Sequence, residues 1–271
     1  MRAYKDIYYK YITFAMIGAI LIGVSAGFTS IDKRILVVAL AVWLVGNALF
    51  WQFLAIKRKK DLEKLLDECK LADYVDSYEA LDQRFPKFGD MQSKADIKLN
   101  LAEGLYAHGE FTEMKRVLDS IELRKSTDLK DLVQKVSFHN LLALYYIERG
   151  ELGMAEAELS ECYPLFDFVK FKEPKRSQCL ESSEIIYATL QLKRGELEGL
   201  DKKFRTWMTE VSRPLTKVIC SYRLGEVYTN HNMTEEANQQ FNFVVKYGGD
   251  SFFAERAEAA LKIKGKHRPM L

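Results

Sequence analysis

The side chains best suited to catalysis or metal binding are four cysteines and four histidines, and their spacing favours neither role. Zinc sites take pairs of cysteines or histidines separated by a few residues, and the sequence contains no such pair. It also has no phosphate-binding glycine loop and no nucleophilic serine between glycines. We therefore expect no enzymatic activity, no metal and no cofactor. The cysteines are expected to be buried free thiols: Cys69, Cys162, Cys179 and Cys220.

The longest uncharged segment, residues 35–56, predicts a transmembrane helix. Its sequence, ILVVALAVWLVGNALFWQFLAI, has 22 residues without a formal charge and ends at four bases, Lys57, Arg58, Lys59 and Lys60. About 20 apolar residues are needed to cross the hydrocarbon core of a bilayer. The segment is long enough, and its polar residues Asn47 and Gln52 are a modest cost to insertion.

A second apolar segment, residues 11–28, precedes the first and predicts a helical hairpin. The connection, residues 29–34, is too short for more than a turn, so both ends of the hairpin are expected on one side of the membrane. Four small residues spaced four apart share one helix face, which permits close helix packing: Ala15, Ala19, Gly23 and Gly27. A cleavable signal peptide ending near Val24-Ser25-Ala26 is the alternative.

Basic residues predict the topology of this membrane anchor, residues 1–60. Seven bases lie at the outer ends of the hairpin and two, Lys33 and Arg34, lie in its connection. Because cytoplasmic flanks carry the excess of Lys and Arg, we expect both termini and the chain after residue 60 in the cytoplasm. The bases Lys57 to Lys60 also suit anionic lipid headgroups, and a topology signal alone is the alternative explanation.

The charge of the remaining chain argues against a nucleic-acid partner. Residues 61–261 carry 27 Lys and Arg against 36 Asp and Glu, a net charge of −9. Such a body is repelled by the phosphates of nucleic acid. The tail, residues 264–271, is basic and is expected to be disordered and solubilising.

Residues 61–263 contain four windows that share one helix-turn-helix pattern. Each has a large apolar residue followed by a small one, a turn residue seven positions after the small one, and apolar residues five and nine positions after the turn. The turn residues tolerate a left-handed backbone conformation. Because β-branched alternation is absent, we expect an all-α fold. The small residues are Ala102, Ala143, Ala188 and Gly225, and the turn residues are Gly109, Gly150, Gly195 and Asn232.

This pattern resembles the tetratricopeptide repeat family over roughly residues 95–247. The resemblance implies an α-solenoid of helix-turn-helix repeats, with the helices of residues 61–85 and 251–263 as its caps. The turn residues lie 41, 45 and 37 positions apart, rather than about 34 as in the family, which implies an irregular superhelix. A generic α-solenoid or helical bundle is the alternative.

The resemblance also implies a concave groove, lined by the first helix of each repeat, that holds a peptide or helix of a partner. The six residues that we expect to contact the partner are Glu103, Tyr106, Asn140, Leu144, Tyr222 and Glu226. The other transferred groove positions are Leu99, Ile147, Ile185, Thr189, Leu192 and Thr229, and about half of the aliphatic positions are expected in the core. Aromatic anchors beside acids favour a basic, apolar partner. Leu99 and Glu103 stand where the family's chaperone-tail receptors have lysine and asparagine, which disfavours that role.

These expectations favour a membrane-tethered adaptor that recruits a protein partner through its repeats. The alternative is a structural subunit or assembly factor of a membrane complex, in which the hairpin makes the main contact. A membrane-bound enzyme with an unrecognised site is a third possibility. If the groove is not the partner site, the insertion Tyr163 to Cys179 is the next candidate, because Phe166, Phe168 and Phe171 are expected to be exposed there.

Overall fold

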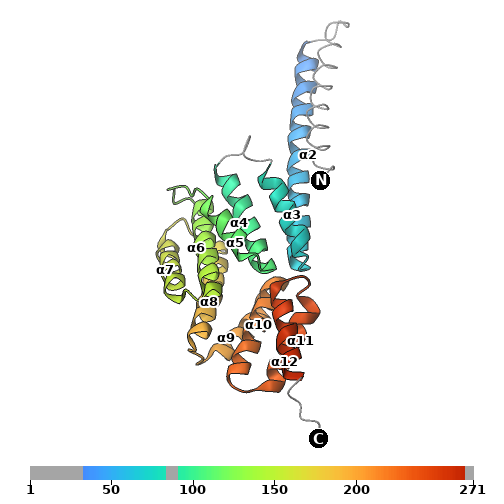
Figure 1. The fold of residues 1–271 in the computed structure, drawn as a ribbon. Coiled ribbons are helices and arrows are strands. Elements are labelled where there is room, and N and C mark those ends of the chain that lie inside the picture. Colours follow the sequence, from blue (N-terminus) through green and yellow to red (C-terminus); the bar gives the residue numbers. More distant parts are fainter. Residues whose placement is uncertain (1–32, 84–90, 266–271) are drawn as a thin grey trace. The chain divides into compact units, whose positions relative to one another are not determined.

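A computed structural model describes residues 33–83 and 91–265, and these residues form helices joined by short connections, without a strand (Figure 1). The predicted all-α class is confirmed. The chain divides into two compact units, residues 1–63 and residues 64–271. The predicted end of the anchor at residue 60 lies close to this division.

The described part of the first unit is the beginning of α2 (Lys33–Asp67). Large apolar side chains three or four residues apart share one face of this helix, and they are 59–67% exposed: Val38, Val42, Val45, Leu49 and Phe53. Over the residues that the structure describes, none of the helices combines the length and the apolarity needed to cross a membrane. The first expected span, with its row of small residues, lies outside the described residues.

The predicted end of the second span at Ile56 is not a helix end. The helix continues through Lys57 to Lys60 as far as Asp67, because lysine and arginine are good helix formers and a run of them does not stop a helix. The two short helices expected in residues 61–85 are therefore the last turns of α2 and the separate helix α3 (Leu71–Asp82).

The second unit is built mainly from four helix pairs that follow the predicted repeats. The pairs are α4 (Met91–His108) with α5 (Phe111–Asp119), α6 (Leu129–Arg149) with α7 (Leu152–Cys162), α8 (Lys175–Arg194) with α9 (Leu200–Glu210), and α10 (Pro214–Asn230) with α11 (Thr234–Tyr247). The 3₁₀ helix η2 (Tyr163–Asp167) follows α7, and α12 (Phe252–Gly265) follows the last pair.

All four predicted turn residues adopt the left-handed conformation, with φ between 60° and 92°: Gly109, Gly150, Gly195 and Asn232. At Gly150, the backbone N–H donates to the carbonyl of Ile147 and closes α6. This prediction is confirmed because the requirement is local. A residue with little steric cost at positive φ can end one helix and let the next begin within a few residues.

The predicted packing positions are also confirmed. Gly225 faces Phe241 so closely that an added Cβ would lie 2.6 Å from the ring. The other small residues, and the apolar residues after each turn, are buried: Ala102, Ala143, Ala188, Met114, Leu118, Ala155, Leu159, Leu200, Phe204, Ala237 and Phe241. At Gly225, the small residue therefore permits the close approach of α11 to α10.

The last helix of the second unit packs against its first helices. The ring of Phe252 lies 5.6 Å from that of Tyr106 in α4 and 5.3 Å from that of Phe111 in α5. Just before α12, the carboxylate of Asp250 accepts hydrogen bonds from the backbone N–H groups of Leu71 and Ala72, at 2.7 and 3.0 Å, and so caps α3. The second unit is therefore closed by contacts between its two ends.

Candidate functional site

The two aromatic residues of the predicted groove are buried against α12. Tyr106 and Tyr222 are 3% and 7% exposed. The ring of Phe253 lies 5.9 Å from that of Tyr106 and 5.5 Å from that of Tyr222. Two predicted partner anchors, on helices far apart in the sequence, are thus brought together, and a side chain of the same chain lies between them.

A fully buried arginine, Arg223 of α10, forms the centre of an ion network beside these rings. Its Nη2 donates to Glu148 of α6 at 2.6 Å, and its Nη1 donates to Glu226 at 2.8 Å. Arg256 of α12 donates to the second oxygen of Glu148 at 2.7 Å, and Lys193 of α8 donates to Glu226 at 2.6 Å. Side chains from α6, α8, α10 and α12 are therefore linked by charge.

The guanidinium of Arg223 lowers the pKa of both acids in this network. Burial raises the pKa of the Glu148 carboxyl, but Arg223 and Arg256 together outweigh it and hold the pKa below its usual value. The pKa of Glu226 is lowered in the same way by Arg223 and Lys193 against burial. Both carboxylates are therefore ionised at neutral pH, and three bases face two acids.

The remaining predicted contact residues also have partners within the chain. Glu103 of α4 accepts from Nη1 of Arg213 at 2.6 Å. The Asn140 side chain is buried and accepts from the hydroxyl of Ser183 at 3.0 Å, while Leu144 packs on the cluster that contains Ala143 and Ile147. The other groove positions that the resemblance implies are buried, except for the exposed Thr229. The buried ones are Leu99, Ile147, Ile185, Thr189 and Leu192.

Sequence reasoning missed Arg223 and Glu148, which hold the network together. A signal was present, because Arg223 shares one helix face with the apolar residues Cys220, three positions before it, and Val227, four positions after it. A charged residue on such a face indicates a buried ion pair, since an unpaired buried charge is strongly unfavourable. The partner was not identifiable, because Glu148 lies 75 positions away in the sequence.

The described residues contain no cluster of His, Cys, Asp and Glu that could hold a metal ion. Cys69, Cys162 and Cys220 are buried and Cys179 is half-buried, all as free thiols. Burial raises the pKa of the Cys162 thiol to about 12 and that of Cys179 to about 11, so neither is a reactive thiolate at neutral pH.

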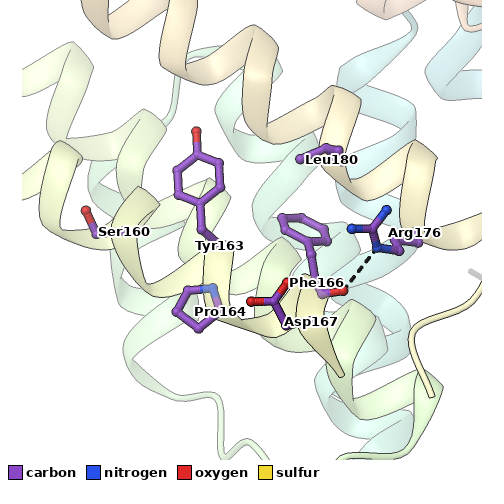
Figure 2. A pocket seen from close by; sticks show the side chains of 7 residues that line it. All are labelled: Ser160, Tyr163, Pro164, Phe166, Asp167, Arg176 and Leu180. Atoms are coloured by element: carbon purple, nitrogen blue, oxygen red, sulfur yellow. Dashed lines mark hydrogen bonds between the residues drawn. The ribbon is translucent and has the colours of Figure 1, made fainter. Parts of the chain in front are cut away.

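A shallow pocket of about 530 Å³ lies at the insertion after α7 (Figure 2). Figure 2 shows Arg176 reaching back to the carbonyl of Phe166, to which its Nε donates at 3.0 Å. Three phenylalanines of the insertion were expected to be exposed, and this is wrong for Phe166 and Phe171. These two are buried and stacked, with ring centroids 5.3 Å apart. They are buried because they fill the space beside α6 and α7. Phe168 is 41% exposed. The residues lining the pocket are Ser160, Tyr163, Pro164, Phe166, Asp167, Arg176 and Leu180.

The second unit is thus a closed array of helix pairs with a buried ion network and a pocket at one loop. Comparison of the chain with family models, with curated proteins and with solved structures finds no match.

Proposed function

We propose that the protein is a membrane-tethered adaptor, anchored by a hairpin of residues 11–28 and 35–56 and carrying a tetratricopeptide-like repeat unit that recruits a protein partner in the cytoplasm. The observation that carries this proposal is the joining of two unlike parts in one chain. One part is an uncharged run of 22 residues in which the described side chains include an exposed apolar face. The other is a separate compact unit of helix pairs.

The exposed face of α2 supports the anchor on physical grounds. Val42 is 67% exposed and Phe53 is 62% exposed, and side chains of this size are favourable in hydrocarbon but unfavourable in water. The bases Lys57 to Lys60 then lie where cytoplasmic bases flank a span. The excess of bases at the outer ends of the hairpin over those in its connection supports the cytoplasmic topology.

A structural subunit or assembly factor is the second candidate, and one observation favours it. Tyr106, Tyr222 and Glu226 of the predicted groove are engaged by Phe253, Arg223 and Lys193 of the same chain. A groove filled in this way offers a partner fewer free contacts. In this second role the repeat unit braces a complex whose main contact is made by the hairpin.

Exchange of the hairpin tests the two functions against each other. Residues 1–56 are replaced by an unrelated two-pass anchor of the same topology, and the proteins crosslinked to the chain in native membranes are compared with those of the parent. An adaptor keeps its partners, because the repeat unit binds them. Loss of the partners while the exchanged protein stays folded and in the membrane would refute the adaptor and support the subunit.

Cysteine labelling tests the topology. With the hairpin retained, a cysteine in place of Ser30 is labelled from outside intact cells by an impermeant thiol reagent, whereas one in place of Lys266 is not. Labelling at position 266 would contradict a cytoplasmic repeat unit. Cleavage near Ala26 would support the signal-peptide alternative.

A further inference from the structure

Exposed apolar and basic side chains gather at one end of the second unit, in two neighbouring loops. The helices α6 and α8 begin at this end, and α7, which pairs with α6, ends there (Figure 1). We call residues 120–130 and 163–176 the loop end. Its large apolar residues Leu129, Tyr163, Phe168 and Val169 are 39%, 42%, 41% and 86% exposed.

The backbone presents Phe168 and Val169 in a fixed turn. The N–H of Phe171 donates to the carbonyl of Phe168 at 2.8 Å, which closes a turn with Val169 and Lys170 at its centre. Phe171 is buried at one end of the turn, and Lys170 pairs with Asp128 of the first loop at 2.6 Å. The tip is therefore held outward by contacts on both sides.

The loop end differs in charge from the rest of the unit. Its two segments carry seven Lys and Arg against four Asp and Glu, a net charge of +3. Since residues 61–261 together carry −9, the remainder carries −12. An anionic surface therefore attracts this end and repels the others. The acids of the loop end are Glu122, Asp128, Asp167 and Glu173, and its bases are Arg124, Lys125, Lys130, Lys170, Lys172, Lys175 and Arg176.

We propose that the loop end is a membrane-contact surface, which places Phe168 and Val169 in the headgroup region of an anionic bilayer with the lysines at the level of the lipid phosphates. The inference rests on the proposed function, because the anchor keeps the unit close to a membrane. Apolar side chains beside lysines are the combination that binds such an interface. Free phosphate would engage the lysines but leave Val169, at 86% exposure, in water.

Depth-dependent quenching in vesicles tests the contact. The full chain, with Cys179→Ser and Val169→Cys, is labelled with an environment-sensitive fluorophore and reconstituted into vesicles containing brominated lipid, either of phosphatidylcholine alone or with phosphatidylserine added. The matched control is Met154→Cys, because Met154 is 49% exposed and lies at the opposite end of α7. We expect the label at position 169 to be quenched in the phosphatidylserine vesicles and the label at 154 to remain unquenched.

Charge reversal provides the second measurement. Lys172→Glu together with Lys175→Glu is expected to lower the ratio of quenched to unquenched label at position 169 by about thirtyfold or more, while Lys202→Glu on α9 leaves it unchanged. Circular dichroism of each variant reports whether the fold is kept. Equal signals at 169 and 154 in both lipids would overturn the proposal, and shielding of position 169 only when a soluble protein is added would assign the loop end to a protein partner instead.

Flotation after a carbonate wash separates this proposal from the anchor. A chain that leaves the vesicles refutes the anchor, and quenching at neutral pH then decides the loop contact independently. A chain that stays in the vesicles with position 169 unquenched refutes only the loop contact.

Discussion

Replacing Arg223 by methionine tests whether the buried ion network holds the second unit together. Methionine keeps most of the apolar contact that the arginine stem makes, and its side chain fits beside Tyr222 and Phe253, over whose rings the guanidinium now lies at 5.5 and 5.6 Å. The substitution removes the hydrogen bonds to Glu148 and Glu226 at 2.6 and 2.8 Å. It therefore isolates the charge of Arg223 from its volume.

The size of the destabilisation depends on the ion pairs that Glu148 and Glu226 keep after the substitution. Breaking a buried ion pair costs about 3–5 kcal/mol because a charge is left without its partner. Here Glu148 keeps Arg256 and Glu226 keeps Lys193, so we expect the lower end, about 3 kcal/mol. The control is Arg194→Met, which removes a pair with Glu156 whose side chains are 26% and 49% exposed. We expect this substitution to be far less costly than Arg223→Met, because water screens an exposed ion pair.

The direction in which the destabilisation changes with pH can also be predicted. In the parent, the pKa values of Glu148 and Glu226 lie below their usual values, so their stabilisation is present above the unfolded pKa and is lost as the pH falls through the folded values. Without Arg223, burial is opposed by one base fewer at each acid, and both pKa values rise relative to the parent. The destabilisation should therefore be greatest at neutral pH and shrink as the pH falls through the range between the folded pKa values of the variant and those of the parent.

Urea unfolding of residues 64–271, followed by far-ultraviolet circular dichroism at several pH values, measures both quantities. A cost no larger than that of Arg194→Met would show that the network is dispensable. A cost that stays constant from neutral pH down through the acid titration of the parent's carboxylates would show that Arg223 acts through packing rather than through charge.

Two further predictions concern the helix pairs. Residues 64–271 alone should be soluble and strongly helical, since they form one compact unit, and a circular dichroism spectrum of strand or coil would contradict this. Gly225→Ala should destabilise by about 1–3 kcal/mol in urea unfolding, because its Cβ would lie 2.6 Å from Phe241, whereas Gly153→Ala, with no atom within 4 Å, should stabilise by up to about 1 kcal/mol.

The helix pairs could be predicted from sequence because their determinants are local. Each pair is specified by residues that lie within about one helical hairpin of each other. They are a turn residue at positive φ, a small residue seven positions before it, and apolar residues after it. Gly150 and Asn232 illustrate this, since each adopts the conformation expected for its residue type. The continuation of α2 through Lys57 to Lys60 could not be read in the same way, because a run of bases marks a membrane flank and a helix equally well.

The contacts of the predicted groove residues could not be predicted, because they depend on distant parts of the chain. Arg223 meets Tyr106 across 117 positions, and Phe253 enters from a helix that the sequence indicates only as a cap. The resemblance supplied the groove positions but not their occupant. Tyr222 and Glu226 are therefore residues whose substitution is expected to affect folding as well as binding.

The closure of the second unit supports a last prediction, which compares two glycines with positive φ. Gly249 has φ of 53°, and an added Cβ would lie 2.3 Å from the carbonyl oxygen of Cys69, whereas Gly150 has φ of 75° with no atom within 4 Å. Alanine at either position has the cost of the left-handed conformation, about 1–2 kcal/mol. Only Gly249→Ala also separates Asp250 from the N-terminus of α3, so we expect it to cost about 1–3 kcal/mol more.

Hydrogen exchange distinguishes loss of closure from general destabilisation. The amides of Leu71 and Ala72 donate to Asp250, so they should lose protection in Gly249→Ala and keep it in Gly150→Ala when exchange is compared at matched global stability. Equal protection in the two variants would mean that α3 is held by its other contacts and that the two ends of the unit are not energetically coupled. Selective loss would mean that the chain just before α12 holds the N-terminus of α3 in place. The two ends of the second unit would then be energetically coupled.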